Sequence, residues 1–401
     1  MSPYVSVVLP RPLRGPLIYQ MPEALRSKAI PGCRVKIPLG TKKMIGCLLA
    51  LTNEKPSFKT KDVLEILDDA PLLSAERLKL LSWASAYYLT PIGEVLRHLL
   101  PPKLLHLKES SRASGRKTLE AIESDSFHAP DFPSLSQDQK EAVRVIRDET
   151  QRPLLLHGVT GSGKTEIYIE TVQEILKEGG QALILVPEIG LTPQILGRFR
   201  RLSHQIAAYH SGLTEAQRYK IWEEVRSGKI SIVIATRSGF FLPFPNLKLI
   251  VIDEEHDTSY KQEERFCYHA RDLALWLGRE GKIKVVLGSA TPSIESLYRV
   301  ETGKMRLVSL PERPVGSLMP TLEVVDRRSL YPQKDDHPLL SERLLDLLRN
   351  TLKKKEQSLL FMNRRGFSPF VLCAQCGFVP RCKQCDISLT LHKGPHALVC
   401  H

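Results

Sequence analysis

The stretch RPLLLHGVTGSGKTEIYIE, residues 152–170, decides the fold expected for this chain. A short apolar run ends at a glycine-rich turn, and a segment with helical character follows the turn. The turn fits G-x-x-x-x-G-K-[ST] at every fixed position, with the residues Gly158, Val159, Thr160, Gly161, Ser162, Gly163, Lys164 and Thr165. The strand–loop–helix context argues against the alternative, a glycine-rich turn with no function.

Each part of this pattern has a physical role in holding a nucleotide. Glycines let successive backbone N–H groups point inward, at the N-terminus of a helix whose dipole favours anions. Lys164 can then reach the β- and γ-phosphates of ATP, and the Thr165 hydroxyl can hold Mg²⁺. The stretch therefore predicts an ATP and Mg²⁺ site at the start of an α/β lobe.

Charge and hydropathy narrow the class of protein. The chain has 57 Lys and Arg against 44 Asp and Glu, a formal net charge of +13. Such a surplus suggests a polyanionic partner, although charge alone does not identify nucleic acid. No uninterrupted apolar run reaches the ~18 residues of a membrane span, so we expect no membrane partner. The N-terminus lacks the basic-then-apolar order of a signal peptide, which argues against export.

Residues 1–105 are expected to form a small β-rich domain. Helical periodicity predicts a helix over Ala75–Tyr88, with Ser74 as its N-cap, and a second helix after Pro91. Alternating and β-branched runs between Pro and Gly residues predict short strands at Tyr4–Leu9, Arg34–Ile37 and Ile45–Leu51.

Two features at the end of this domain have competing explanations. Tyr87 and Tyr88 could form a stacking platform for a nucleobase, but at the end of an apolar helix they are more readily explained as core residues. Residues 106–134 are polar, rich in Ser and Pro, and basic in their first half. They predict an exposed linker, with one short helix near Thr118–Ile122.

Residues 135–319 are expected to form a doubly wound lobe with a parallel sheet. Nearly all-apolar runs such as Leu247–Ile252 are typical of strands buried on both faces. That run ends in Asp253 and Glu254, beside the predicted phosphate site. There Asp253 can hold Mg²⁺ through water, and Glu254 can orient and deprotonate the attacking water. The other expected elements are strands at Ala182–Val186, Ile206–Tyr209, Ile230–Ala235 and Ile283–Leu287 and helices at Gln194–Leu202 and Thr214–Ser227.

Two further features of this lobe carry weaker signals. A helix is expected over Leu135–Arg147, with Ser136 as its N-cap. Gln139 on this helix could present its amide to the adenine edge, because it lies just upstream of the glycine-rich turn. The turn at Gly288–Pro292 has small hydroxyl residues that suit a hinge sensing the nucleotide, with a purely structural turn as the alternative.

Cysteines gather at the C-terminal end. Three of the eight are scattered and are expected to be buried small side chains. The other five, in two C-x-x-C pairs and one single position, fit zinc ligands better than disulfides or a redox pair. Five thiolates cannot fill two four-coordinate sites, so we expect at most one tightly held zinc. These residues are Cys373, Cys376, Cys382, Cys385 and Cys400.

Several motifs together carry a resemblance to a known family. GVTGSGKTE, DEEH and GSATPS, in this order, resemble the first motifs of superfamily 2 helicases. Five further segments are specific to one family within this superfamily. They are LVPEIGLTPQ (185–194), HSGL (210–213), ATRSG (235–239), VIDEEHDTSYKQEERFCYHARDLA (251–274) and FMNRRGFSPFVLCAQCG (361–377). Over nearly its whole length the chain resembles the PriA family of replication-restart helicases, primosomal protein N′. The resemblance implies a RecA-like first motor lobe.

The resemblance also implies a role for residues 1–105. They would capture the 3′ end of a leading strand at a stalled fork. Gly40 and Lys61 fall where the family lines its 3′-end pocket. Where the family has Phe-Asp-Tyr, this chain has Leu17-Ile18-Tyr19, so Ile18 removes an acidic partner for the terminal hydroxyl.

Further DNA contacts are implied for the motor lobe. Residues 260–269 resemble the family's aromatic-rich loop, which couples DNA binding to hydrolysis, so bases are expected to stack on its rings. Arg237, in the Thr-Arg-Ser turn, would contact the DNA backbone. The loop residues concerned are Tyr260, Phe266, Tyr268 and His269.

The sequence departs from the family pattern in two places. Residues 106–134 are too few for the winged-helix domain that the family usually carries. Residues 320–372 hold only the start of a second motor lobe, and residues 373–401 hold an incomplete zinc module. The later motifs, with the arginines that complete the ATP site, are absent from the sequence. We therefore expect the chain to bind nucleotide and DNA and to hydrolyse ATP poorly.

The function implied is ATP-dependent 3′-to-5′ DNA unwinding that restarts replication at stalled or abandoned forks by primosome assembly. The implied cofactors are ATP, Mg²⁺ and Zn²⁺, two zincs in the intact module. The implied partners are forked and single-stranded DNA, single-stranded DNA-binding protein and other primosome proteins, in the bacterial cytoplasm near the nucleoid. One alternative is a non-catalytic fork-binding module with a nucleotide site. A second, a translocase subunit of a restriction-type nuclease, is disfavoured by the paired cysteines.

Overall fold

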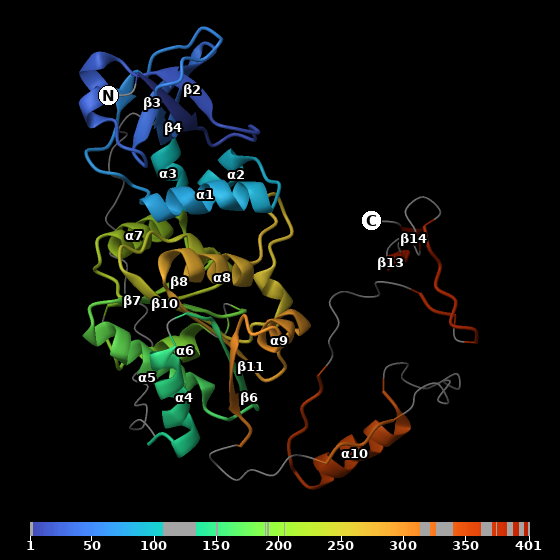
Figure 1. Cartoon of the computed structure of the whole chain (residues 1–401). Helices are drawn as coiled ribbons and strands as arrows, with labels where there is room; N and C mark the ends of the chain where they lie inside the picture. Colours follow the sequence, from blue (N-terminus) through green and yellow to red (C-terminus); the bar gives the residue numbers. More distant parts are fainter. Residues whose placement is uncertain are drawn as a thin grey trace. The chain divides into compact units, whose positions relative to one another are not determined.

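The computed structural model describes residues 3–106, 134–149, 151–188, 190, 192–203, 205–312, 321–325, 340–361, 371–373, 375–382, 388–392 and 397–399. The chain divides into two compact units, Met1–Ser317 and Leu318–His401, which are described separately. Figure 1 traces the chain from the blue N-terminal strands, through the green and yellow lobe, to the red C-terminal elements.

The first unit begins with an antiparallel sheet of five strands, in the order β2-β1-β4-β3-β5. A β-bulge falls between Ser6 and Val7 where β1 pairs with β4. The inward side chains form a small core of their own that includes Val5, Val35 and Leu48, each fully buried. The strands are β1 Tyr4–Val8, β2 Leu17–Gln20, β3 Arg34–Leu39, β4 Lys42–Thr52 and β5 Glu65–Ile66, with the 3₁₀ helix η1 Glu23–Lys28 after β2.

Three helices follow this sheet: α1 Ala75–Tyr87, α2 Ile92–Leu99 and α3 Pro102–Leu105. The Ser74 hydroxyl caps α1 by accepting a hydrogen bond from the Arg77 backbone N–H. The three strands and two helices expected in this region are confirmed, while β2, β5 and α3 had no clear pattern. Residues 107–133, which include the expected linker helix, lie outside the described residues.

A seven-stranded parallel sheet, in the order β12-β6-β11-β10-β7-β9-β8, forms the next layer. All five residues of β7 and all four of β9 are buried, as expected for strands covered on both faces. The strands are β6 Leu154–Gly158, β7 Gln181–Leu185, β8 Ile206–Tyr209, β9 Ile232–Ala235, β10 Leu247–Ile252, β11 Lys284–Ser289 and β12 Arg306–Leu310.

Helices cover both faces of this sheet (Figure 1). The helix expected before the glycine-rich turn is confirmed, and Ser136 and Gln139 form a reciprocal capping box at its start. The helices are α4 Gln137–Asp148, α5 Lys164–Lys177, α6 Thr192–Phe199, α7 Glu215–Arg226, α8 Ala270–Gly281 and α9 Ile294–Glu301, with the 3₁₀ turns η3 Arg237–Phe241 and η4 Thr258–Tyr260.

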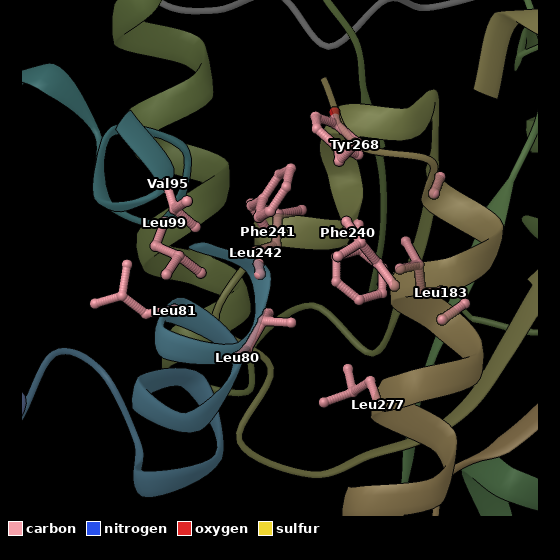
Figure 2. Close-up of a cluster of buried hydrophobic side chains, with 14 of the residues drawn as sticks. Leu80, Leu81, Val95, Leu99, Leu183, Phe240, Phe241, Leu242, Tyr268 and Leu277 are labelled. Carbon is pink, nitrogen blue, oxygen red and sulfur yellow. The ribbon is translucent and has the colours of Figure 1, made fainter. Parts of the chain in front are cut away.

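The N-terminal helices share a core with the parallel lobe. Figure 2 shows Leu80 of α1 and Val95 of α2 beside Phe240, Phe241 and Leu277 of the lobe, in one buried cluster. The buried Arg77 guanidinium donates to the carbonyls of Phe240 at 2.9 Å and of Leu242 at 2.7 Å. Burying a charge this way is favourable only when its donors are satisfied, so α1 is tied to the lobe in one register.

The second unit is described at α10 Glu342–Lys353 and at a hairpin of β13 Thr390–His392 and β14 Ala397–Val399. The Ser341 hydroxyl caps α10 by accepting from the Leu344 backbone N–H. Across the described parts of both units, no helix is long and apolar enough to cross a membrane.

Candidate nucleotide site and DNA-binding surfaces

The glycine-rich turn joins β6 to α5 and folds as a phosphate loop. Gly161 and Gly163 have φ values of 83° and 82°, in the left-handed region that glycine adopts without cost. A Cβ on Gly158 would approach the Ser162 Oγ to 2.4 Å, so the loop can close this tightly only with glycine there. The local sequence thus places the N-terminus of α5 directly after the turn.

The polar groups of this loop fit a bound phosphate chain. The buried Ser162 Oγ has no hydrogen-bond partner among the described residues. The Lys164 Nζ donates to the Gly158 carbonyl at 3.0 Å, so the ammonium spans the loop from its last residues to its first. An unpaired buried hydroxyl is costly unless a ligand satisfies it. Lys164 and the N–H groups at the start of α5 are the groups that would hold a triphosphate.

The acidic pair lies at the carboxyl end of β10, next to β11 and β7 in the sheet. The Tyr168 hydroxyl donates to the Asp253 Oδ1 at 3.0 Å. Burial, together with the neighbouring charge of Glu254, raises the pKa of Asp253 above its ordinary value. Glu254 is held at φ 47°, an unusual conformation for a residue with a side chain.

Tyr168 is a site residue that the sequence did not reveal. It lies one helical turn after Lys164 on α5, and its ring is buried against β11. A Cβ on Gly288 would come within 1.6 Å of the Tyr168 hydroxyl, so that glycine is required for the contact with Asp253. The i, i+4 spacing from Lys164 was the available signal, since it places both side chains on one helix face.

Gln139 is held inside the protein by its neighbours, and its contact with adenine stays a prediction. Gln139 is 5% exposed, and both ends of its amide are engaged. Its Oε1 accepts from the Ser136 backbone N–H at 2.9 Å, and its Nε2 donates to the Ser162 carbonyl at 2.9 Å. The capping box of α4 uses one lone pair of the Gln139 Oε1, and the Nε2 also positions the phosphate loop.

The third acidic residue of the motif, Glu255, anchors a buried network. Its carboxylate is fully buried. It accepts hydrogen bonds from the Arg271 Nη1 at 2.9 Å and from the Ser293 backbone N–H at 2.7 Å. Burial opposes ionisation of Glu255, but these hydrogen bonds outweigh it and lower its pKa. Arg271 belongs to α8 and Ser293 caps α9, so one carboxylate joins three elements.

The turn after β11 contacts the acidic motif through a histidine. The His256 Nδ1 lies 2.7 Å from the Ser289 Oγ, and its Nε2 lies 3.4 Å from the Thr291 Oγ1. The Glu254 Oε2 lies 3.7 Å from the same Nδ1. These contacts place the predicted hinge turn next to the acidic pair. A movement of the Glu254 side chain would therefore move His256 and the turn at Gly288–Pro292.

Three of the four aromatic side chains expected to stack on bases are buried, and His269 is half-buried, so base stacking on this loop stays a prediction. Tyr260 and Phe266 are 0% exposed and Tyr268 is 2% exposed. The Tyr260 hydroxyl lies 2.6 Å from the Asp253 carbonyl, so this ring positions the acidic motif. His269 caps α8, with its Nδ1 accepting from the Arg271 backbone N–H at 3.2 Å. The three buried rings belong to the same hydrophobic core as buried residues of α2 and η3.

Arg237 also contacts this loop. Its Nη1 donates to the carbonyls of Ser259 at 2.5 Å and of Lys261 at 3.2 Å. The guanidinium is half-buried and holds the start of the loop against η3. Its contact with a DNA backbone stays a prediction.

The two residues expected at a 3′-end pocket are brought together in the N-terminal domain. The Lys61 Nζ donates to the Gly40 carbonyl at 3.1 Å, and both residues are exposed. Gly40 has a φ of 61°, so the turn between β3 and β4 uses glycine's freedom. Ile18 lies on β2, opposite Ser6 of β1. A cation beside an exposed glycine turn is a suitable contact for a terminal phosphate or sugar.

Three of the five clustered cysteines belong to the described residues, and Cys385 and Cys400 lie outside them. Cys373 and Cys376 are exposed on either side of a turn that ends at Gly377, whose φ is 73°. Backbone N–H groups of Cys376 and Gln375 lower the pKa of the Cys373 thiol. This turn suits a pair of thiolate ligands, although the described residues contain no group of three metal-ligating side chains.

Comparisons with known proteins cover the same parts of the chain. Residues 6–101 match the family profile described as the 3′DNA-binding domain. Residues 136–300 match the DEAD/DEAH box helicase profile. Residues 382–401 match the profile of the PriA DNA helicase Cys-rich region.

Curated relatives extend these matches along the chain. Replication restart protein PriA of Rickettsia felis is 38% identical over 397 residues, covering 99% of this chain and 59% of that protein. The Haemophilus influenzae protein of the same name is 36% identical over 468 residues, covering 99% of this chain and 63% of that protein. That of Bacillus subtilis is 43% identical over 272 residues, covering 67% of this chain and 34% of that protein. The chain therefore spans about three fifths of the first two relatives.

Fold and site together define a DEAD/DEAH-type helicase ATP-binding lobe, preceded by an antiparallel DNA-binding domain. The chain belongs to the PriA family of replication restart proteins. The expected fold class, a small β-rich domain followed by a RecA-like parallel lobe, is confirmed.

Proposed function

We propose that this chain binds forked and single-stranded DNA and uses ATP to move on it from 3′ to 5′ in the restart of stalled replication forks. The observation that carries the proposal is the meeting of Lys164, Asp253 and Glu254 at the carboxyl edge of one sheet, in a unit that shares its core with the DNA-binding domain. Residues 1–105 hold DNA in this proposal, and residues 135–319 hold ATP.

The proposed chemistry assigns one task to each residue. Lys164 and the N–H groups of the loop neutralise and position the β- and γ-phosphates. Asp253, held by Tyr168, would hold Mg²⁺, and that ion would offset charge on the phosphate oxygens. Glu254, which follows Asp253 at the end of β10, orients the attacking water and accepts its proton.

The remaining assignments follow from the family. Gly40 and Lys61 contact the 3′ end of the leading strand, and Arg237 contacts the backbone of the strand in the motor lobe. The cysteine-rich residues hold zinc. Single-stranded DNA-binding protein and other primosome proteins are the proposed partners, in a bacterial cytoplasm near the nucleoid. Residues 320–372 contribute the start of a second motor lobe.

Two equilibrium measurements test the proposal. A fluorescent ATP analogue with Mg²⁺ is titrated into the chain, and a labelled fork with a 3′ leading-strand end is titrated separately. The proposal expects both ligands to bind, and expects the fork to change the affinity for nucleotide. Nucleotide binding without fork binding would contradict the proposed role in replication restart. Fork binding without nucleotide binding would instead support the alternative, a non-catalytic fork-binding module.

A further inference from the structure

Three aromatic rings from two domains form one continuous stack at the C-terminal end of α1. The Trp83 ring stacks on Trp276 of α8, with centroids 4.8 Å apart and planes 16° apart. Trp83 also stacks on Tyr87, with centroids 4.8 Å apart and planes 18° apart. Tyr88 meets the edge of both α1 rings, at 6.2 Å from Trp83 and 4.8 Å from Tyr87. The stack is therefore fixed from three sides.

Tyr87 is the open end of this stack. It is 57% exposed, whereas Tyr260, Phe266 and Tyr268 in the neighbouring loop are 0–2% exposed. Among the described residues, its only ring contacts are Trp83 behind it and Tyr88 at its edge. One face of a rigidly held ring is thus presented to solvent, which is the arrangement that a planar ligand requires.

Leu89, two residues further on, is a second unusual feature of this surface. It is 91% exposed and has a φ of 51°, in the position after a helix where glycine is the usual residue. A leucine there is strained and leaves its apolar side chain in water. Neither feature stabilises the free chain, so this surface is built for contact with something apolar.

The surrounding charges favour a nucleic acid. Lys79 lies two helical turns before Tyr87 on the same face of α1, is exposed, and has no ion-pair partner among the described residues. The Lys261 Nζ lies 5.7 Å from the Tyr88 ring centroid. The Lys261 ammonium also donates to the Cys267 carbonyl at 2.9 Å. The acids nearby are Glu76, which interacts with Lys79, and Asp272, which is paired with Arg299 at 3.6 Å. Lysine ammonium groups near an aromatic surface suit a base with its phosphates.

We propose that Tyr87, backed by Trp83 and Trp276, is a stacking platform for an unpaired base of single-stranded DNA. The inference rests on the proposed DNA-dependent function and gives it a location. The platform lies at the junction of the DNA-binding domain and the motor lobe, because Trp276 belongs to α8 of the lobe. A strand leaving the N-terminal domain for the motor would cross this junction.

Binding of short oligothymidylate to the full chain tests the platform. Tyr87→Ala should weaken binding by roughly fivefold to a hundredfold, the range measured for one stacked base. Tyr87→Phe keeps the ring and should bind as the parent chain does. Tyr298→Ala removes a comparably exposed tyrosine, 60% exposed on α9, and should leave the affinity unchanged.

Tryptophan fluorescence gives an independent readout. Of the three tryptophans, two lie in the stack and Trp222 is 3% exposed. A base stacked on Tyr87 should quench the emission of Trp83 and Trp276. The quenching should disappear in Tyr87→Ala and persist in Tyr298→Ala.

Abasic substitution in the oligonucleotide separates the platform from a general effect on the fold. In the parent chain, removing the base that reaches Tyr87 should weaken binding as much as Tyr87→Ala does. In Tyr87→Ala the same abasic site should cost nothing further, since the two changes remove one interaction. Additive losses, or equal affinity of Tyr87→Ala and the parent chain, would overturn the platform while the proposed function stands. Absence of any oligonucleotide binding by the parent chain would overturn both.

Discussion

At the scale of single residues, Lys164 separates nucleotide binding from DNA binding. Its ammonium donates to the Gly158 carbonyl within the phosphate loop, and among the described residues it has no hydrogen bond to the N-terminal domain. Lys164→Ala is therefore expected to abolish binding of a fluorescent ATP analogue and to leave fork affinity within about twofold of the parent chain, less than 0.5 kcal/mol. Both affinities are measured by titration on the same preparation.

The control for this prediction is Lys177→Ala, at the last residue of the same helix and away from the loop. It should change neither affinity. Equal losses of nucleotide and fork binding in Lys164→Ala would mean that the substitution damages the fold, and the assignment of Lys164 to the phosphates would lose its support.

Asp253 is predicted to link nucleotide binding to pH. Its raised pKa means that the carboxylate becomes protonated at a higher pH than an ordinary aspartate. Mg²⁺-dependent nucleotide affinity should therefore fall as pH is lowered through that raised pKa, and recover as pH rises. A raised carboxyl pKa also means that the folded state disfavours the charge, so Asp253→Asn should raise the Tm at neutral pH.

Affinity titrations over a range of pH check the predicted loss of nucleotide binding at low pH. Thermal melts of the parent chain and of Asp253→Asn check the predicted rise in Tm. Asp253→Asn should bind nucleotide weakly at every pH and lose the acid-dependent change. A lower Tm for Asp253→Asn at neutral pH would contradict the burial argument, because Tyr168 can still donate to the asparagine oxygen.

At the scale of elements, the pair of Glu255 and Arg271 holds β10, α8 and α9 together. Both side chains are buried, at 0% and 8% exposure. Arg271→Met leaves an unpaired buried carboxylate and should cost about 3–5 kcal/mol of unfolding free energy. Glu255→Leu combined with Arg271→Met removes both charges and should recover much of that loss. Urea unfolding of the parent chain, both single variants and the double variant measures the coupling.

A matched control is Arg279→Met, whose arginine is 78% exposed on the same helix. It should change the unfolding free energy by less than about 0.5 kcal/mol. If Arg271→Met costs no more than Arg279→Met, the buried pair does not hold the three elements together.

Elements with one strong local pattern could be predicted from the sequence, and elements fixed by tertiary packing could not. The strand of Leu247–Ile252 and the helix capped by Ser136 lie where apolar runs and capping residues place them. Helices α8 and α9 and strand β12 were not expected, because their apolar residues are set by contacts with distant elements. Periodicity within one segment cannot report such contacts.

The same limit applies to two of the expectations about the site. Gln139 was assigned to adenine from its position, but its amide oxygen completes a capping box whose S-x-x-Q pattern was present in the sequence. The loop aromatics were assigned to DNA from the family, but their burial depends on α1 and α2, which are far away in the sequence. Residue type and spacing reveal which groups can act, and packing decides which faces are free.

At the scale of the whole molecule, charge is predicted to govern DNA affinity. The chain carries a formal net charge of +13, and phosphate contacts release counterions. The association constant for a fork should fall steeply as salt rises, with a log–log slope of roughly −0.9 per phosphate contacted on duplex DNA. Fluorescence anisotropy over a series of salt concentrations gives this slope, and Lys61→Ala should make it shallower by about one contact. A flat response would contradict a basic DNA-binding face.

The central claim is that one unit couples an ATP site to DNA-binding surfaces. The most direct test is ATP turnover by the 401-residue chain with and without a fork that carries a 3′ end, with Lys164→Ala as the control. The account predicts slow turnover under both conditions, in keeping with the expected poor hydrolysis, with a measurable increase when the fork is added and no turnover in Lys164→Ala. Fork binding with no change in turnover, or turnover that survives Lys164→Ala, would contradict it.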